Sequence, residues 1–449
     1  MRNIRSEAIA TLKLGAPLIA AQLAQISITF VDTIMAGRLS ARDLAAVAIG
    51  SSAWFPIWAL TVGPLLAVTP TVAQLFGAGK YNDIGHTARQ GLWMSLAVGA
   101  MGFFVVRNVF GPVLSWLNVE PEIVPISLGY LDAIAWGLPG MCGYQALRSF
   151  SEGVSRTKPV MYASLIALAG NTIGNYIFMY GRLGMPRLGA VGCGVASAIV
   201  MWIMFSFMAV YIYFNKNYAK YGVFSRFEWP RVKEIVALTK LGVPIAISLF
   251  MEGSFFGAVA MVMGSLGTTV VAGHQIAINV ASITFMIPLG IGMAISVRVG
   301  QAAGRGDPHG ARVAGFVGIG IAGVFMAGAA LFMLTFTEFI AGVYTQDQAV
   351  KQMSVTLLLM AAIFQISDGL QVSGAGALRG LKDTRVPMLI TALAYWGIGM
   401  PLGYVLGITW SGGPTAIWIG IIFGLAIAAV LLNARFYLVT RGENPTPLR

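Results

Sequence analysis

The sequence predicts an all-α membrane protein: twelve transmembrane helices in two six-helix lobes related by a pseudo-twofold axis along the membrane normal. Three observations support this fold class. Hydrophobic residues make up 57% of the 449 residues and charged residues only 10%, whereas a soluble domain has about 25% charged residues. Apolar stretches of about 20 residues, each able to cross roughly 30 Å of hydrocarbon, recur along the whole chain. The third observation is an internal repeat.

The apolar spans are separated by short polar connections. We expect them near residues 11–36, 44–76, 87–113, 122–147, 158–181, 188–214, 234–263, 269–297, 311–336, 349–376, 386–409 and 414–439. The longer spans indicate tilted helices or helices that extend beyond the bilayer. The longest polar connection divides the chain, which predicts an N-lobe over 1–214, a cytoplasmic linker over 215–233 and a C-lobe over 234–449.

The basic residues predict the orientation of the chain. If both termini and every second connection lie on one side, that side holds all but six of the 29 Lys and Arg residues. Basic connections stay in the cytoplasm, so both termini are expected there. The basic N-terminus and the apolar run after it resemble a signal peptide, but the run continues to Met35 and predicts an uncleaved first helix.

The second half of the chain repeats the first. Lys13-Leu14-Gly15, with Pro17, returns 227 residues later as Lys240-Leu241-Gly242, with Pro244. The same shift pairs the residues Gly37 with Gly264, Gln74 with Gln301, Gly77 with Gly304, and Gly79 with Gly306. Because six crossings return the chain to its starting side, the copies enter the membrane in the same orientation. Parallel repeats of this kind place substrate and ion sites near the bilayer midplane.

Four acids lie within the apolar interior of the spans: Asp32, Asp132, Glu252 and Asp368. A carboxylate at the centre of a bilayer costs on the order of 2.5–3.5 kcal/mol, so such residues usually face an interior pathway. The repeat does not preserve them, since Asp32 corresponds to Val259. A carboxylate required for folding would be expected in both copies, so each acid is expected to have a task specific to its own half.

The surroundings of the acids suggest different roles. Asp32 is predicted to be a protonatable or cation-binding carboxylate, or else an acid that reaches the interface at a helix end. Glu252 and Asp368 lie deeper and have no Lys or Arg within their own spans, so a proton, a metal cation or a cationic substrate would supply the missing charge. Asn171 and Asn175 lie one helical turn apart and would support Asp32 if the helices meet.

Other polar residues leave two interpretations open. Asp132 is equally consistent with a structural and a functional role. His274 and Gln275 are candidates for hydrogen bonds to a ligand or an acid, although a histidine satisfied within the core is the simpler interpretation of His274. The 55 Gly and 22 Met residues fit close helix packing around an adaptable apolar cavity.

Several chemistries are not supported by the sequence. Gly77-Ala78-Gly79-Lys80 lacks the remainder of a phosphate-binding loop, and there is no nucleophile elbow or zinc helix motif. The net charge of +12 is scattered over the connections, so a nucleic-acid partner is not expected. Cys142 and Cys193 lie in apolar spans and predict neither a disulfide nor a metal cluster. No enzyme activity and no cofactor are expected.

Several segments of the chain resemble those of a known family. Phe30-Val31-Asp32-Thr33-Ile34-Met35-Ala36-Gly37 is similar to the first-helix signature of the multidrug and toxic compound extrusion (MATE) transporters, in their bacterial NorM-like branch. Further similar segments are Val72-Ala73-Gln74-Leu75 with Gly77-Ala78-Gly79, Ser296-Val297-Arg298-Val299-Gly300, and Ala377-Leu378-Arg379-Gly380 with Asp383. The resemblance covers nearly the whole chain.

The resemblance implies a cation-coupled drug antiporter of the bacterial inner membrane, in which two lobes open a central cavity alternately to each side. It also implies that Asp32 and Asn175 serve an N-lobe site, and that Glu252 and Asp368 serve a C-lobe cation site with Na⁺ as a candidate ligand. Two positions depart from the family's patterns. Asn175 stands where some branches have a second acid, and Phe364 stands where a Tyr often precedes the C-lobe acid.

The resulting hypothesis is exchange of external H⁺ or Na⁺ for a lipophilic cationic drug or dye, by a monomer surrounded by membrane lipids, which would confer antibiotic resistance. Neutralising an acid would release the cation that it held. The alternative is a flippase for lipid-linked precursors, but that function would need basic residues deep in the spans to meet phosphates, and the predicted spans contain none there. A passive channel would differ by not requiring a gradient.

Overall fold

The computed structural model describes residues 4–116 and 120–441, and every regular element in these ranges is helical. Contacts divide the chain into two compact units. The N unit comprises Ala20–Ala246, and the C unit comprises Met1–Ile19 together with Ile247–Arg449. The unit boundaries fall inside two long helices, α1 (Ile4–Gly37) and α10 (Val232–Ser265). The division into lobes at 215–233 remains a prediction.

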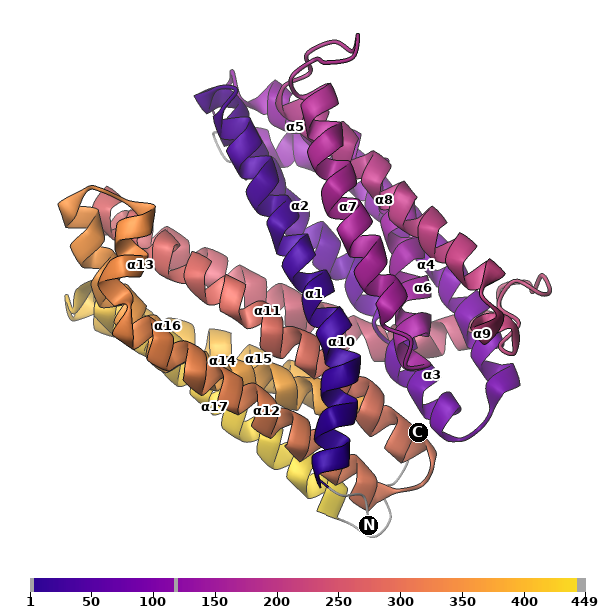
Figure 1. The fold of residues 1–449 in the computed structure, drawn as a ribbon. Coiled ribbons are helices and arrows are strands. Elements are labelled where there is room, and N and C mark those ends of the chain that lie inside the picture. Colours follow the sequence, from indigo (N-terminus) through magenta and orange to yellow (C-terminus); the bar gives the residue numbers. More distant parts are fainter. Residues whose placement is uncertain (1–3, 117–119, 442–449) are drawn as a thin grey trace. The chain divides into compact units, whose positions relative to one another are not determined.

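The N unit contains most of α1 and the first part of α10, together with the helices between them. These are α2 (Ala41–Leu65), α3 (Val68–Gly77), α4 (Tyr81–Trp116), α5 (Val124–Ala135), α6 (Leu138–Gly153), α7 (Lys158–Phe178), α8 (Ala190–Phe214) and the short α9 (Lys216–Ala219). Within this unit α8 packs against α5, α6 and α7 (Figure 1). This packing places the interior faces of α7 and α8 against each other.

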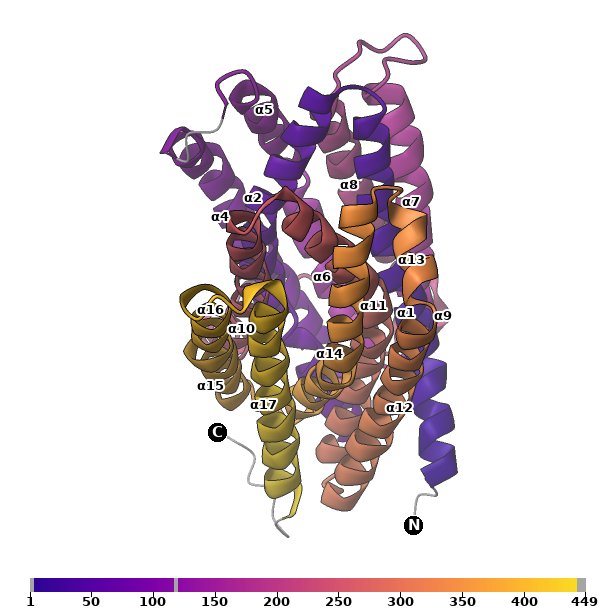
Figure 2. The same ribbon diagram turned by 90° about the vertical axis from the view of Figure 1, so that its left-hand side faces the viewer.

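The C unit is built around one central helix. Its remaining elements are α11 (Thr268–Gly304), α12 (Pro308–Thr335), α13 (Thr337–Tyr344), α14 (Gln348–Gly380), α15 (Arg385–Ala392), a π-helical segment (Leu393–Gly399), α16 (Met400–Tyr404), a second π-helical segment (Val405–Thr409) and α17 (Gly413–Arg441). Helix α14 packs against α11, α12 and α17 (Figure 2). The buried core of this unit includes Phe255, Phe364, Tyr395 and Trp418.

The helices confirm the predicted fold class. Ten segments among the described residues are long and apolar enough to cross a membrane. Of the two other expected spans, 158–181 corresponds to the 21-residue α7. The expected span 122–147 is formed by α5 and α6, which are separated only at Trp136 and Gly137. Both of these residues keep helical backbone angles, so the chain kinks there without reversing.

The backbone repeats as the sequence predicts. Gly79 and Gly306 both have a positive φ, of 73° and 70°. In each copy the two amides from this glycine onward bond to carbonyls of the preceding helix, which closes the helix end. Ser155 and Lys382, also 227 residues apart, have φ values of 61° and 62° although neither is glycine. Shared left-handed turns at equivalent positions indicate one ancestral backbone plan for both halves.

The copies differ in where their helices are irregular. In the N unit, the segment equivalent to α11 is divided into α2 and α3, and the segment equivalent to α14 is divided into α5 and α6. In the C unit both equivalents are continuous, whereas the segment equivalent to α7 contains the two π-helical stretches. Those stretches and α16 between them pack closely on α17, where a Cβ on Gly420 would collide with the backbone of Gly403 in α16.

Candidate functional site

The structure brings Asp32, Asn171 and Asn175 together in the N unit. The Asn175 side-chain amide donates to the Asp32 carboxylate at 2.6 Å and to the Asn171 oxygen at 3.1 Å. The Asn171 amide in turn donates to the Ser197 hydroxyl on α8 at 3.4 Å. Asp32 is 9% exposed and both asparagines are fully buried. The structure therefore brings both asparagines to Asp32, and their role at the site stays a prediction.

Helix geometry explains this arrangement. Asn171 and Asn175 are four residues apart on α7, so both side chains leave the same face of the helix. The amides orient the Asp32 carboxylate without neutralising it, because asparagine carries no charge. Asn175 Oδ1 is buried and has no hydrogen-bond partner among the described residues. An acidic oxygen next to an unused acceptor is a setting suited to a proton or a small cation.

The C unit gathers a second set of acidic groups. Asp368 on α14 is 3% exposed, and Glu252 on α10 is partly buried. The two carboxylates interact electrostatically, and the Tyr395 phenol lies in the field of both. The Tyr395 hydroxyl is buried and makes no hydrogen bond within the part of the chain that the structure describes. Two acids and a free phenol oxygen thus converge in this unit.

An aromatic cluster adjoins these acids. Phe255, three residues after Glu252, stacks on Tyr395 with ring centroids 5.2 Å apart. Phe364 lies one helical turn before Asp368, is 2% exposed, and contacts Phe256 and Trp418 edge to face. Aromatic faces attract cations. The ring at position 364 is therefore buried one helical turn from the acid, without the hydroxyl that a Tyr would add.

The two predicted polar residues of α11 point to different environments. His274 is 1% exposed, and its ring meets Trp418 at 5.7 Å. Its Nδ1 has no partner among the described residues. Gln275 is exposed. Of this pair His274 joins the aromatic cluster, through Trp418, whereas the Gln275 side chain is exposed.

Asp132 has a different partner from the other three acids. It forms an ion pair with Arg107 on α4, with Nε and Oδ1 2.8 Å apart, and both side chains are about half exposed. The Arg107 guanidinium also lies over the Phe103 ring. This geometry favours the structural interpretation of Asp132, which the sequence had left open.

Sequence reasoning did not identify two neighbours of the acids. One is Tyr395, one of many aromatic residues in apolar spans, which carries no sequence signal of its proximity to Glu252 and Asp368. The other is Cys193, which the sequence indicated only as a small core residue and which lies close to the Asp32 carboxylate. In both cases the contact joins helices distant in the sequence, so local patterns contain no information on it.

The donor set limits the ions that these sites could hold. Among the described residues, no three His, Cys, Asp or Glu side chains cluster closely enough to hold a metal ion. The C unit nevertheless offers oxygen donors from Glu252, Asp368 and the unpartnered Tyr395 hydroxyl, and hard cations prefer oxygen ligands. A proton would need one carboxylate alone. In chemical terms these donors fit either H⁺ or Na⁺.

Long apolar helices that shield carboxylates from lipid define the class: a multi-pass membrane protein with ionisable groups inside its helical units. The family follows from comparison with known proteins. The MatE family model matches residues 17–177 and again residues 244–405, and the two matches begin 227 residues apart, as the internal repeat does. The chain belongs to the MatE family.

Characterised relatives cover almost the whole chain. The multidrug resistance protein PmpM of Pseudomonas aeruginosa is 44% identical over 437 residues, which are 96% of this chain and 92% of the relative. The multidrug resistance protein NorM of Aliivibrio fischeri is 42% identical over 450 residues, covering 99% and 97%. Solved structures agree in fold: the crystal structure of the eukaryotic MATE transporter AtDTX14 has a TM-score of 0.89 at 19% identity, covering 97% and 96%.

Proposed function

We propose that this protein exports lipophilic cationic drugs or dyes from the cytoplasm in exchange for H⁺ or Na⁺, by alternating access of two lobes. The observation that carries the proposal is the presence of separate shielded acid sites, Asp32 with Asn175 in one unit and Glu252 with Asp368 in the other. The names of the relatives, which are multidrug resistance proteins, support the substrate class. The protein works as a monomer in the bacterial inner membrane, with both termini in the cytoplasm.

Charge neutralisation couples the two fluxes. An ionised Asp32 or Asp368 attracts a cationic substrate in a medium of low dielectric constant, where the attraction is strong. A proton or Na⁺ that enters from outside cancels that charge and weakens the hold on the substrate. A ligand shifts a conformational equilibrium only by its differential affinity for the two states. Exchange therefore needs an acid that is accessible from one side of the membrane in the inward-open state and from the other side in the outward-open state.

The two acid sets suit different parts of this cycle. The Asp32 carboxylate is held by amide donors, which favours a single well-oriented charge that one proton neutralises. Glu252 and Asp368 repel each other when both are ionised, which favours uptake of a cation between them. The buried aromatic rings around Phe364 provide an apolar, adaptable wall for a lipophilic cation. The C unit is therefore the stronger candidate for Na⁺, and the N unit for H⁺.

Transport by the purified protein in liposomes tests the proposal. A fluorescent lipophilic cation is loaded, and a pH gradient or a Na⁺ gradient is imposed alone. We expect gradient-driven efflux, and a loss of at least about tenfold in Asp32→Asn and Asp368→Asn. Asp132→Asn is the matched control, because the same substitution there affects a half-exposed ion pair and should retain efflux.

Efflux that persists without either gradient would indicate a channel and contradict the antiport mechanism. Efflux in the two site variants that equals that of the Asp132→Asn control would contradict the assigned residues, even if the protein proved to be an antiporter.

A further inference from the structure

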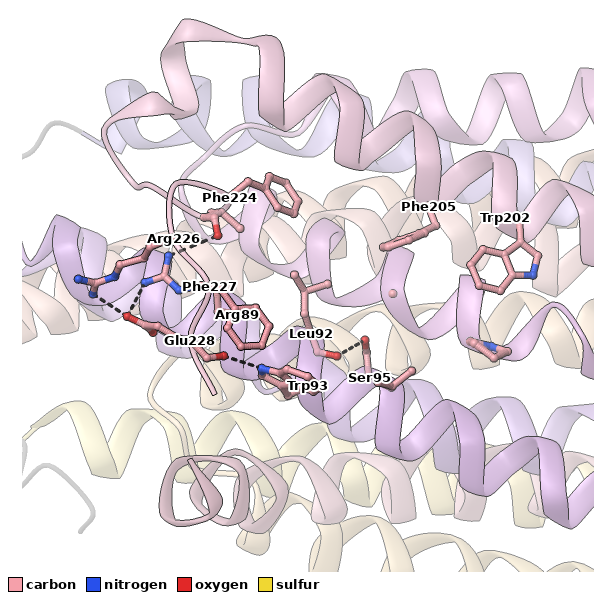
Figure 3. Close-up of a pocket in the computed structure, with 14 residues that line it drawn as sticks. Arg89, Leu92, Trp93, Ser95, Trp202, Phe205, Phe224, Arg226, Phe227 and Glu228 are labelled. Carbon is pink, nitrogen blue, oxygen red and sulfur yellow. Dashed lines mark hydrogen bonds and ion pairs between the residues drawn. The ribbon is translucent and has the colours of Figure 1, made fainter. Parts of the chain in front are cut away.

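The N unit contains an open cavity of about 490 Å³ whose lining does not include Asp32, Glu252 or Asp368. It lies between α4, α6, α8 and the polar connection after α9, and its lining includes Trp93, Phe205 and Phe227 (Figure 3). Its volume falls in the range of small-molecule sites, roughly 300–1,000 Å³. We call this cavity the α4–α8 groove.

The two ends of the α4–α8 groove differ in chemistry. Figure 3 shows Arg89, Arg226 and Glu228 together at one end, and Phe205 and Trp202 at the other. The charged end is formed by Arg89 of α4 and by the connection between α9 and α10, and the aromatic end by α8. The groove therefore has the polarity of an amphiphile, with a head region and a tail region.

The charged end is a built structure. Trp93 Nε1 donates to the Glu228 carbonyl at 2.8 Å, and Gln90 donates to the Trp229 carbonyl at 3.2 Å. Arg89 Nη1 donates to the Val223 carbonyl at 3.3 Å. Three side chains of α4 thus hold the connection along the groove. These hydrogen bonds fix the shape of the charged end of the groove.

The charge at this end favours an anion. Glu228 accepts from Arg89 Nη2 at 3.1 Å, from Arg226 Nη2 at 2.6 Å and from His86 Nδ1 at 2.5 Å. The hydrogen bonds from Arg89 and His86 lower the pKa of Glu228 to about 2. Two guanidinium groups and an imidazole thus already occupy this acid, which offers little to a cationic drug. Arg226, whose side chain is 65% exposed, has five N–H donors of which Glu228 uses only part.

The outer surface beside the groove is apolar and aromatic. Along α8 a shallow hollow continues from Trp202 over Ile203 and Phe207. Phe227 and Trp229 are 69% and 75% exposed at the charged end. Exposed aromatic side chains near span ends are typical of the membrane interface. This pattern fits a charged end at headgroup level and an aromatic end at the depth of the acyl chains.

We propose that the α4–α8 groove binds an anionic phospholipid, with its phosphate at Arg226 and one acyl chain along Trp93, Phe205 and Trp202. Basic pockets between transmembrane helices on the cytoplasmic side are suited to anionic headgroups. The bound lipid would connect α4, α8 and the connection after α9, three parts of one unit. Nothing in the exchange mechanism requires this site, so it can be tested independently.

Native mass spectrometry of the purified full chain tests the proposal. Phosphatidylglycerol and phosphatidylcholine with identical acyl chains are added separately. We expect preferential binding of phosphatidylglycerol, and a loss of about fivefold in Arg226→Gln, the effect of one basic residue near an anionic surface. Arg231→Gln is the matched control, since Arg231 is similarly exposed, pairs with Glu234 and does not line the groove. It should change binding by less than about twofold.

Photolabelling locates the lipid. Phosphatidylglycerol with a diazirine on its acyl chain should label the α4 and α8 peptides that contain Trp93 and Phe205. Glycerol phosphate, which has the headgroup alone, should not compete at equal concentration. Equal binding of both lipids, equal losses in the two arginine variants, labelling confined to other helices, or displacement of the lipid by tetraphenylphosphonium would each overturn the proposal. The last result would indicate a drug site instead.

Discussion

The N unit and the C unit share a backbone plan but use it for different chemistry. In the N unit one acid, Asp32, is held by neutral amides from α7. In the C unit two acids lie near a phenol and an aromatic cluster. The turns that the repeat preserves, such as those at Gly79 and Gly306, contain none of these groups. Duplication thus kept the elements that fold each copy and left the ionisable positions free to diverge.

The two units also differ in which of their helices are irregular. The N unit has breaks in the equivalents of α11 and α14 and a regular α7, which carries Asn171 and Asn175 at helical spacing. The C unit has a continuous α14 carrying Asp368, and a π-helical segment carrying Tyr395. Single π-helical turns often occur at functional sites because they shift side chains out of the regular helical register. The residue that lies near the acids is therefore on the equivalent helix in both units. That helix is a regular α-helix in the N unit and contains π-helical stretches in the C unit.

The largest expected effect concerns a buried ion pair of the C unit. Arg298 donates from Nε and Nη2 to both Glu7 oxygens at 2.7 Å, and the Glu7 side chain is 2% exposed. Arg298→Ala would leave a buried carboxylate without this partner, so we expect the free energy of unfolding to fall by about 3–5 kcal/mol. Unfolding in detergent by denaturant titration measures it.

The control for this variant is Arg42→Ala, which removes an ion pair whose two side chains are mostly exposed and should change stability by less than about 1 kcal/mol. Similar losses in both variants would show that the Glu7–Arg298 contact does not secure the start of α1 within the C unit.

A smaller effect is expected from the N-unit site. Asn175→Ala removes the donor to Asp32 and the link to Asn171, which leaves buried polar groups unpaired at a cost of about 1–3 kcal/mol. Because Asp32 also loses its orientation, gradient-driven efflux should fall by at least about tenfold. Thr172→Ala, on an exposed face of the same helix, is the control. Normal efflux in Asn175→Ala would show that the Asn175 amide is not required for the proposed exchange.

The repeated turns should respond equally in both units. Gly79 and Gly306 have positive φ and open space where a Cβ would lie, so an Ala meets only the backbone cost of a left-handed conformation, about 1–2 kcal/mol. We expect the same loss of unfolding free energy in Gly79→Ala and Gly306→Ala, measured by denaturant titration. Gly320→Ala, in a helix with open space, should be neutral or stabilising. Unequal losses of unfolding free energy at the two turns would contradict the structural equivalence of the halves.

The smallest effect on stability is expected at Tyr395. Tyr395→Phe keeps the ring that stacks on Phe255 and removes only the unpartnered hydroxyl, so the free energy of unfolding should change by less than about 1 kcal/mol. If the phenol oxygen contacts the transported ion, the concentration of ion needed for half-maximal efflux should rise several-fold. Tyr404→Phe, at a half-exposed position on α16, should leave it unchanged. An unchanged ion dependence in Tyr395→Phe would exclude the hydroxyl from the site.

Much of the fold was predictable, because its causes are local. Each segment that crosses a membrane must pair its own backbone polar groups, because lipid offers them no hydrogen bonds. Span length and composition therefore identify helices such as α8 and α17 without knowledge of their neighbours. The repeat was visible because Lys, Gln and Gly positions recur at one shift. The kink at Trp136 and Gly137 was not predicted, since Gly137 occupies an apolar span whose hydropathy gives no sign of a break.

The sites were predictable only in part. Asp32, Glu252 and Asp368 stand out because a charge is rare and costly in an apolar span, and Asn171 and Asn175 share a face by their spacing. Which of these groups meet was a different question. His274 and Gln275 are adjacent in sequence, yet one is buried against Trp418 and the other is exposed.

The sequence by itself determined that this chain is a duplicated bundle of membrane-spanning helices with a few shielded acids, because hydropathy and charge act residue by residue. Only the tertiary structure decided that Asn175 bonds to Asp32, that Tyr395 lies near Glu252 and Asp368, and that Asp132 pairs with Arg107. These contacts depend on the rotation and packing of whole helices, which arise from many weak contacts summed over residues far apart in the chain.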